Sequence, residues 1–281
     1  MRSLTVAIGL LTLKTASLLV LANGYAQQSL PVRVDRGLEV RSLAGQVSRF
    51  QKTVSQPARV GDFLRAIGDG LITSKGAKAI LFVDTGIGVV DVAENTNLVV
   101  QELSFAPDNG RITKLFVSQG QARLRVRPFT HRGSKLEIRT PVGLSGVRGT
   151  DFGIAVQPNG KTGLAVTQGQ VSSEALGKAV AVNGGFQNFI LPNEPPSPPV
   201  PLRNDTRLVY SFQRIIQGGI RKVQLNGQVD PVNAVQVNGV PQVTDREGRF
   251  KTQLEIFPPP LFQVLVQTPL GKEQRHDLVF R

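Results

Sequence analysis

The chain has 281 residues, which is long enough for about two domains that each bury an apolar core. It contains no cysteine, and this excludes disulfides, thiolate metal sites and cysteine nucleophiles. Its formal net charge of +13 favours anionic partners; the alternative is that the charge serves only solubility. Its 29 Gly and 18 Pro favour short strands joined by tight turns.

Residues 1–26 have the composition of a secretory signal peptide. Arg2 is followed by a stretch without acidic residues up to Ala22, and Gly24-Tyr25-Ala26 offers small side chains at the positions that a signal peptidase reads. We therefore expect cleavage after Ala26; the alternative is an uncleaved anchor, although Lys14 interrupts a stretch shorter than the roughly 20 apolar residues of a spanning helix. Removal of this segment leaves a net charge of +11. No later segment is long and apolar enough to cross a membrane, so we predict a periplasmic or secreted protein.

The first block of strands is predicted over residues 35–190. Strands are expected at Lys78–Val83 and Val89–Val92, joined by the turn Asp84-Thr85-Gly86. The period-two alternation of Arg123–Arg127 and Lys135–Arg139 predicts two more strands. Further short strands, at residues 164–166 and 180–182, continue the series at a spacing that is typical of a β-sandwich or a short β-solenoid.

Two pentapeptides of this block share one pattern. Residues 117–121 and 166–170 both read Val-Ser/Thr-Gln-Gly-Gln. Each places a glycine, Gly120 or Gly169, where a strand turns a corner, because a positive φ costs glycine little. Two copies do not establish a repeat array.

A proline-rich segment, residues 192–201, divides the chain. Six of its ten residues are proline, so we expect a polyproline-II linker of about 30 Å at roughly 3.1 Å per residue. Beyond it, residues 222–281 predict a small sandwich of about seven strands, in which Asn238-Gly239 marks a hairpin. Such a sandwich resembles a bacterial Ig-like domain. Residues 202–221 remain unassigned, since they could belong to either block.

The motifs of the first block resemble the FecR-domain family over about residues 35–190. The motifs are Val60-Gly61-Asp62, Leu71-Ile72-Thr73 with Ala77, Asp84-Thr85-Gly86, Thr140-Pro141-Val142-Gly143, Gly146-Val147-Arg148-Gly149-Thr150-Asp151-Phe152, Val166-Thr167-Gln168-Gly169-Gln170-Val171 and Val182-Asn183-Gly184-Gly185. The string from Thr-Pro to Arg-Gly-Thr-x-Phe is the most specific of them. At the hairpin the family more often has Asp-Gly-Ser.

The resemblance implies an all-β extracytoplasmic domain that, in iron-uptake regulators, passes a signal from an outer-membrane receptor to a sigma factor. Those regulators also carry a cytoplasmic segment followed by a membrane helix. The few residues before the export signal leave no place for such a segment, so we expect the sigma-factor mechanism not to transfer. A periplasmic binding module is what the resemblance then implies.

The signature residues predict a scaffold. Pro141 fixes its own φ and makes Thr140 extended, and Gly146 and Gly149 allow sharp bends. Phe152 anchors the following strand. The structural signature consists of Thr140, Pro141, Arg148, Gly149, Thr150 and Phe152.

Arg148 has two interpretations. Its guanidinium would form a fork-type pair with a carboxylate, Asp151 or Asp91, or bond backbone carbonyls. The other interpretation is that it reads a ligand.

A basic face is the candidate binding surface. Three arginines would project from one strand at intervals of about 7 Å, with further basic residues on the neighbouring strand. The six residues are Arg123, Arg125, Arg127, Arg132, Lys135 and Arg139. Bidentate guanidinium contacts suit an anionic polysaccharide or peptidoglycan, and the alternative is an ordinary solvated strand face.

No catalytic, cofactor or metal residue is predicted. His131 lies in a loop, and no second ligand accompanies it. Gly143-Leu144-Ser145-Gly146 is shorter than a nucleophile elbow and is expected to be a β-turn. Nothing in the sequence sets Asp91 and Glu94 at the separation that glycoside chemistry requires.

We therefore predict an exported, non-catalytic FecR-domain protein that acts as an envelope binding or scaffold module. The alternative is an extracytoplasmic component of a signal-transduction system that senses a surface receptor or ligand. The expected partner is an envelope protein or an anionic polysaccharide or peptidoglycan. Nucleic acid is not expected, because export separates the protein from it.

Overall fold

Alternation of apolar and polar residues produces strands throughout the part of the chain that the structure describes. The computed structural model describes residues 36–51, 54–84, 86–147, 149–256 and 261–280. All of these belong to one unit, Val34–Arg281, and no helix occurs among them. The predicted all-β fold class is confirmed, whereas the expected signal peptide, residues 1–26, lies outside the described residues.

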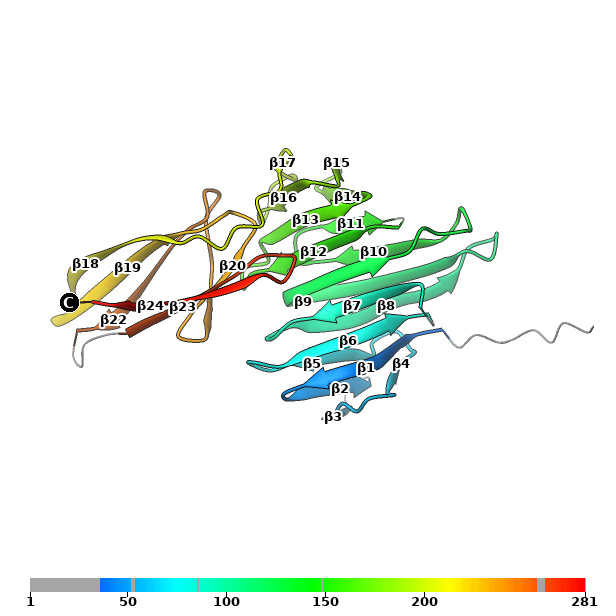
Figure 1. Cartoon of the computed structure of the whole chain (residues 1–281), viewed down its shortest axis with the longest axis horizontal. Helices are drawn as coiled ribbons and strands as arrows, with labels where there is room; N and C mark the ends of the chain where they lie inside the picture. Colours follow the sequence, from blue (N-terminus) through cyan, green and yellow to red (C-terminus); the bar gives the residue numbers. More distant parts are fainter. Residues whose placement is uncertain (1–35, 52–53, 85, 148, 257–260, 281) are drawn as a thin grey trace, which may run out of the picture. The chain divides into compact units, whose positions relative to one another are not determined.

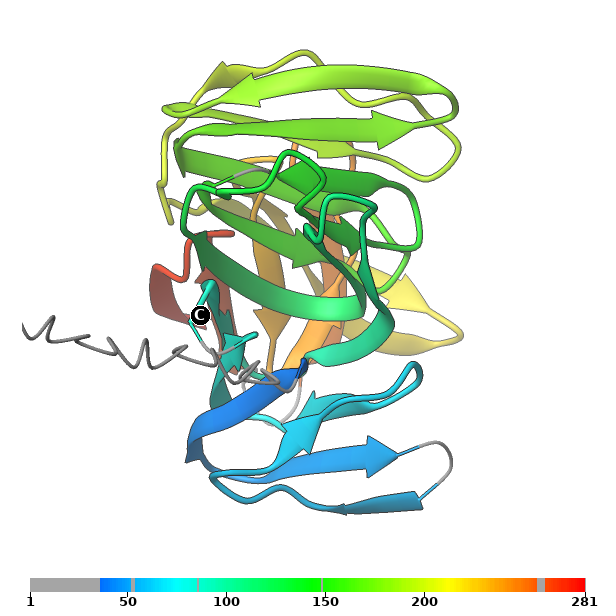
Figure 2. The same ribbon diagram turned by 90° about the vertical axis from the view of Figure 1, so that its right-hand side faces the viewer.

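The first seventeen strands form the N-terminal block, which consists of two sheets (Figure 1). Sheet A has the order β4 (Phe63–Leu64), β1 (Leu38–Ala44), β6 (Lys78–Val83), β7 (Gly88–Val92), β9 (Arg111–Val126), β12 (Asp151–Val156), β13 (Thr162–Gln168), β16 (Phe186–Ile190) and β17 (Val200–Pro201). The strands follow the sequence along the stack, from blue and cyan at one end to yellow-green at the other (Figure 2).

Sheet B has a similar arrangement. Its order is β3 (Val54–Pro57), β2 (Val47–Gln51), β5 (Gly70–Thr73), β8 (Asn97–Phe105), β9, β10 (Lys135–Arg139), β11 (Leu144–Val147), β14 (Gln170–Ala175) and β15 (Lys178–Asn183). The pair β9–β10 is parallel, and the other pairs are antiparallel. The inner faces of both sheets share one core, to which Leu81 and Phe152 of sheet A and Leu98 and Leu115 of sheet B contribute.

Strand β9 is common to the two sheets. Its first part pairs with β8 and β10 in sheet B, and residues from Gly120 onward pair with β7 and β12 in sheet A. The corner lies at Gly120, where φ is +91° and an added Cβ would lie 2.3 Å from Thr96 Oγ1. Gly169, with φ of +79°, joins β13 of sheet A to β14 of sheet B. The predicted glycine corners are therefore confirmed at both positions.

The last seven strands form the C-terminal module, a second pair of antiparallel sheets. One sheet has the order β18 (Val209–Gln217), β19 (Ile220–Gln228) and β22 (Arg249–Glu255). The other sheet has the order β21 (Val240–Gln242), β20 (Ala234–Val237), β23 (Leu261–Gln267) and β24 (Glu273–Val279). A separate core, with Leu225, Phe250 and Phe262, lies between them. Residues 209–217, which the sequence left unassigned, pair with β19.

The proline-rich segment runs back along sheet A. Val200 and Pro201 pair with Gln187 and Phe186 of β16, and the Ser197 amide donates to the Phe189 carbonyl. The segment is therefore not a spacer that stands clear of the first block: Ser197, Val200 and Pro201 lie against β16.

Two glycines of sheet A let loops of the C-terminal module approach the strand backbone. A Cβ on Gly153 would lie 1.9 Å from the Pro269 carbonyl oxygen, and one on Gly163 would lie 2.0 Å from the Val232 carbonyl oxygen. Real Cβ atoms do not come this close to backbone. A side chain at either position would separate the C-terminal module from sheet A.

Buried polar groups complete this contact. Gln157 Nε2 donates to the Asn233 carbonyl at 3.0 Å and to Thr244 Oγ1 at 2.9 Å. Lys161 Nζ donates to Thr244 Oγ1 at 2.8 Å and to the Asp245 carbonyl at 2.5 Å. Because these groups are buried, each bond that is lost leaves an unpaired polar atom.

Candidate functional site

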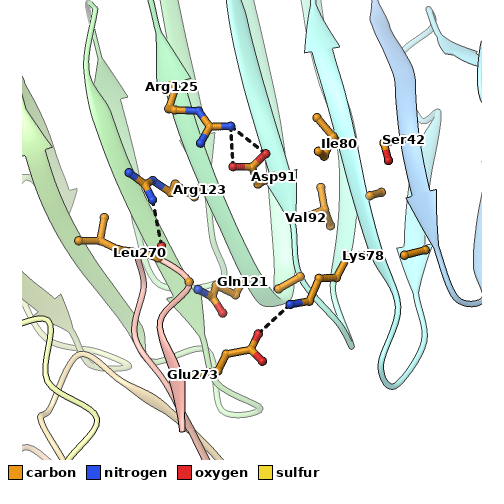
Figure 3. Close-up of a pocket in the computed structure, with 14 residues that line it drawn as sticks. Ser42, Lys78, Ile80, Asp91, Val92, Gln121, Arg123, Arg125, Leu270 and Glu273 are labelled. Carbon is orange, nitrogen blue, oxygen red and sulfur yellow. Dashed lines mark hydrogen bonds and ion pairs between the residues drawn. The ribbon is translucent and has the colours of Figure 1, made fainter.

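A groove of about 440 Å³ lies on the outer face of sheet A. One side is formed by β1, β6, β7 and β9, and the other by the turn between β23 and β24 (Figure 3). The alternation of β9 sends Ala122 and Leu124 into the core and leaves Gln121, Arg123 and Arg125 on the groove side. Two of the predicted basic residues therefore line this groove.

Arg123 is held by two groups. Its Nε and Nη2 donate to the two carboxylate oxygens of Asp151 at 3.0 and 2.9 Å, a bidentate pair across β9 and β12. Its Nη1 donates to the Leu270 carbonyl of the C-terminal module at 3.3 Å (Figure 3). The hydrogen bond to Asp151 raises the pKa of Arg123, and burial opposes that effect. Arg123 is therefore a fixed wall of the groove.

Arg125 and Lys78 are more accessible. Arg125 Nη2 lies 2.8 Å from Asp91 Oδ2 of β7, and its side chain is 46% exposed. Lys78 Nζ lies 3.3 Å from Glu273 Oε1, so this ion pair joins β6 to β24 across the groove (Figure 3). Exposed ion pairs are worth about 1 kcal/mol or less, so a bound partner can replace them.

Gln121 is buried and lines the groove beside these charges. Its Nε2 donates to the Thr268 carbonyl of the C-terminal module at 2.5 Å. Its Oε1 accepts no hydrogen bond from the described residues. An unpaired buried carbonyl costs about 1–3 kcal/mol, so this side chain lowers the stability of the fold at the groove.

The structure does not gather the predicted basic residues on one face. Lys135 and Arg139 lie on β10, whose neighbour is the first part of β9 in sheet B, whereas Arg123 and Arg125 lie in sheet A. Arg132 is exposed in the loop before β10. The expectation of one shared face is therefore wrong, because β9 changes sheets at Gly120, before Arg123 and Arg125.

Arg127 lies just beyond the end of β9. It is exposed, and its amide donates to the Ile87 carbonyl. It therefore belongs to the same end of sheet A as Arg125, although it does not line the groove.

The signature residues occupy structural positions. Thr140 is buried, and its hydroxyl accepts from Thr162 Oγ1 at 3.0 Å. Gly149 has φ of +78° and a Cβ there would lie 2.6 Å from Pro128 Cα. The remaining described members are Pro141, which is exposed, and Thr150 and Phe152, which are buried. Arg148 lies outside the described residues, and its two candidate carboxylates pair with Arg123 and Arg125.

Two local expectations are wrong. Gly146 does not bend the chain; it lies within β11, opposite Glu137 and Ser172. The turn precedes it, since the Thr140 amide donates to the Gly143 carbonyl, and Ser145 is a buried strand residue rather than part of a β-turn. His131 is exposed beside Thr130, as expected of a loop residue.

Sequence reasoning missed two buried cations. Arg36 forms an ion pair with Asp84 at 2.8 Å, and their side chains are 9% and 1% exposed. Asp84, which was predicted only as the first residue of a turn, is therefore also the buried carboxylate that accepts hydrogen bonds from Arg36. Lys161 is fully buried, and burial lowers its pKa to about 8. Each depends on a partner far away in the sequence, and no local pattern marks either residue.

Within the described ranges, no three His, Cys, Asp or Glu side chains come together as a metal site would require. None of the elements described there is a helix long and apolar enough to cross a membrane.

The family described as "FecR protein" matches residues 70–172, which run from β5 to β14. These residues are a FecR domain. They contain the groove strands β6, β7 and β9 and all of the signature residues. The match is to a family of envelope-associated regulators. No curated protein matches the chain.

The solved structures that match parts of the chain include the following three. Two are described as a "putative anti-sigma factor" from Parabacteroides distasonis ATCC 8503; they are 18% and 17% identical, with TM-scores of 0.39 and 0.37. Each match covers 51% of this chain and 66% of the other, so the chain spans just under two thirds of their length. The third, a polysaccharide lyase, is 9% identical with a TM-score of 0.18, and covers 87% of this chain and 39% of the other.

Proposed function

We propose that this protein is a non-catalytic binding protein of the cell envelope, and that its FecR domain takes up an extended segment of an exported partner protein in the groove of sheet A. One observation carries the proposal. The walls of the groove come from both halves of the described chain, β6, β7 and β9 on one side and the turn between β23 and β24 on the other. A segment bound there would contact both at once.

The lining of the groove supports a protein segment over an anionic polysaccharide. Lys78 and Arg125 are each paired with a carboxylate, so the basic residues do not present a uniform positive field. Ile80 adds partly exposed apolar surface beside them. Alternating charged and apolar groups suit side chains of a polypeptide, which carry both characters, better than a uniformly acidic polymer.

Gln121 connects the groove to the C-terminal module. Its side chain belongs to the groove lining, and its Nε2 donates to the Thr268 carbonyl. Because Gln121 is hydrogen-bonded to the Thr268 carbonyl, a movement of Gln121 on binding of a segment in the groove would also move the turn between β23 and β24.

The remaining parts of the proposal concern organisation and location. We propose that residues 35–190 form one domain and that residues 192–201 connect it to the second. The second domain, expected at 222–281, is an Ig-like sandwich that begins earlier, at β18. Its first, second and fifth strands form one sheet and the other four the second sheet, an order that supports this assignment. Export to the periplasm or beyond follows the signal peptide predicted at residues 1–26. In this setting, the signalling role of the domain would consist of reporting the partner that occupies the groove.

The test is capture of envelope proteins by the full chain and by two matched variants. Arg125→Ala removes an exposed guanidinium from the groove, and Arg139→Ala removes an exposed guanidinium from β10 in sheet B. Both lose little stability, because neither side chain is buried. We expect a protein that the unmodified chain retains to be lost with Arg125→Ala and kept with Arg139→Ala.

Salt separates the polysaccharide alternative. In this assay, purified peptidoglycan or acidic polysaccharide is added to the unmodified chain and to both variants at increasing salt. Binding that weakens steeply with salt, and that is equally weak in both variants, would show charge-driven binding outside the groove. That result would replace the proposal.

A further inference from the structure

Most sheet edges of this protein carry a device that prevents pairing with another strand. Sheet A ends in two-residue strands, β4 and β17, and β17 contains Pro201. In sheet B, β3 ends at Pro57. In the C-terminal module, β21 has Pro241, and β24 carries Glu273, Arg275 and Asp277. Short edges, prolines and charges are the usual means by which soluble proteins keep edge strands apart.

Strand β18 lacks these devices. It has nine residues, contains no proline, and pairs in continuous register with β19 from Val209 to Gln217. Among the described strands, β19 is its one neighbour. Arg214 is the single charged residue in it. A row of backbone N–H and C=O groups about 30 Å long, at roughly 3.3 Å per residue, is therefore open for pairing.

Apolar side chains accompany the open edge. Tyr210, Phe212, Arg214 and Ile216 share the face of β18 that meets the core of the module, where Phe212 packs. Tyr210 is 49% exposed and Ile216 is 75% exposed. A strand placed beside β18 would cover both.

The charge of this hairpin is of one sign. Between residues 209 and 228 there are three cations, Arg214, Arg221 and Lys222, and no Asp or Glu. Arg221 and Lys222 stand opposite Ile216 and Ile215 in the register. Arg214 lies between Phe212 and Ile216 on the same face of β18, with its guanidinium 5.2 Å from the centre of the Phe280 ring.

We infer that β18 is a docking edge for an extended segment of another exported protein, which adds to the sheet as a further strand. The segment has apolar side chains at alternate positions, opposite Tyr210 and Ile216, and an acidic side chain opposite Arg214. Main-chain hydrogen bonds supply the affinity, and the alternate side chains supply the specificity. This surface is independent of the groove on sheet A.

A second copy of this chain fits the edge less well. The edge is about 30 Å long and about 10 Å thick, so two copies would bury roughly 600 Å², against about 1,200–2,000 Å² in a stable interface. Two copies would also bring together hairpins that both carry positive charge. A single acidic segment meets the opposite charge.

The experiment uses the full chain and a fluorescein-labelled nine-residue peptide in which Val and Thr alternate and one central Val is replaced by Glu. Fluorescence anisotropy measures its dissociation constant. We expect binding that weakens at least tenfold when the Glu is replaced by Lys, and a reversed preference in Arg214→Glu. A peptide N-methylated at every second residue, which cannot form the strand ladder, is expected to bind at least tenfold more weakly.

The control is the same Ile→Asp substitution made at a second exposed isoleucine, away from β18. Ile216→Asp removes the apolar contact at the edge, whereas Ile67→Asp makes the same change at a side chain that is 70% exposed in a turn of the N-terminal block. We expect at least a tenfold loss for the first and no change for the second. Circular dichroism confirms that both variants are folded.

Three results would overturn the inference. The first is no binding of the Glu peptide at millimolar concentration, and the second is equal binding of the N-methylated peptide. The third is a concentration-dependent dimer, seen by sedimentation, that Ile216→Asp abolishes; this would identify a second copy as the occupant.

Discussion

Lys161 offers a quantitative test of how the C-terminal module docks on sheet A. The residue directly precedes β13. Its Nζ donates to Thr244 Oγ1 and to the Asp245 carbonyl of the C-terminal module. Its ammonium lies 5.1 Å from the centre of the Phe189 ring. No carboxylate forms an ion pair with it among the described residues. The cation is therefore buried with hydrogen bonds but without a direct counter-charge.

Burial lowers the pKa of Lys161 from 10.5 to about 8. The unfolded chain, in which the lysine has its ordinary pKa, consequently binds the proton more tightly than the folded chain. Between about pH 8 and pH 10.5 the unfolded state holds more protons, so the free energy of unfolding rises with pH across that window. Each pKa unit is worth about 1.36 kcal/mol, so the expected rise is about 3 kcal/mol.

The assay is urea denaturation of the full chain and of Lys161→Met at pH 7, 8.5 and 10.5. Met has a similar length and no charge, and other titrating groups contribute equally to both proteins. We expect the stability of the unmodified chain relative to Lys161→Met to increase by about 3 kcal/mol from pH 7 to pH 10.5. Lys178→Met, which changes an exposed lysine of β15, is expected to give a difference that does not vary with pH. A flat difference for Lys161→Met as well would refute the reasoning.

Three further predictions concern the fold. Gly120→Ala, at positive φ and facing a neighbouring backbone, is expected to cost about 2–4 kcal/mol in thermal or urea unfolding, whereas Gly146→Ala, with open space around it, is expected to leave stability within about 0.5 kcal/mol. Gly163→Val is expected to release the C-terminal module from sheet A, seen as new proteolytic cleavage between two folded fragments; an unchanged digestion pattern would contradict the docking. Asp84→Ala leaves Arg36 buried without its carboxylate and is expected to cost about 3–5 kcal/mol, measured by urea unfolding.

Local strand signals could be predicted well from the sequence. The expected strand Lys78–Val83 is β6, and Lys135–Arg139 is β10, with identical bounds. The hairpin at Asn238-Gly239 is present, with φ of +52° and +81°. These features depend on alternation and turn chemistry, which act over a few residues and are therefore visible in a single sequence.

Strand partners could not be predicted in the same way. Alternation shows that Arg123 and Arg125 leave the core, but it does not show which strands flank them. Those strands bring Asp151 and Asp91, which lie 28 and 34 residues away in the chain and neutralise the expected basic face. The groove was missed for the same reason, because one of its walls comes from the turn between β23 and β24, which is distant in the sequence.

Strand β9 also has a mechanical consequence. One continuous backbone runs beneath the groove in sheet A and then forms the middle of sheet B, with no loop between the two parts. A loop would absorb a small displacement, but a corner at one glycine with a tightly packed neighbour does not. A displacement of residues 121–126 on binding at the groove would therefore also displace residues 111–119. The displacement would reach β8 and β10 of sheet B, which pair with these residues.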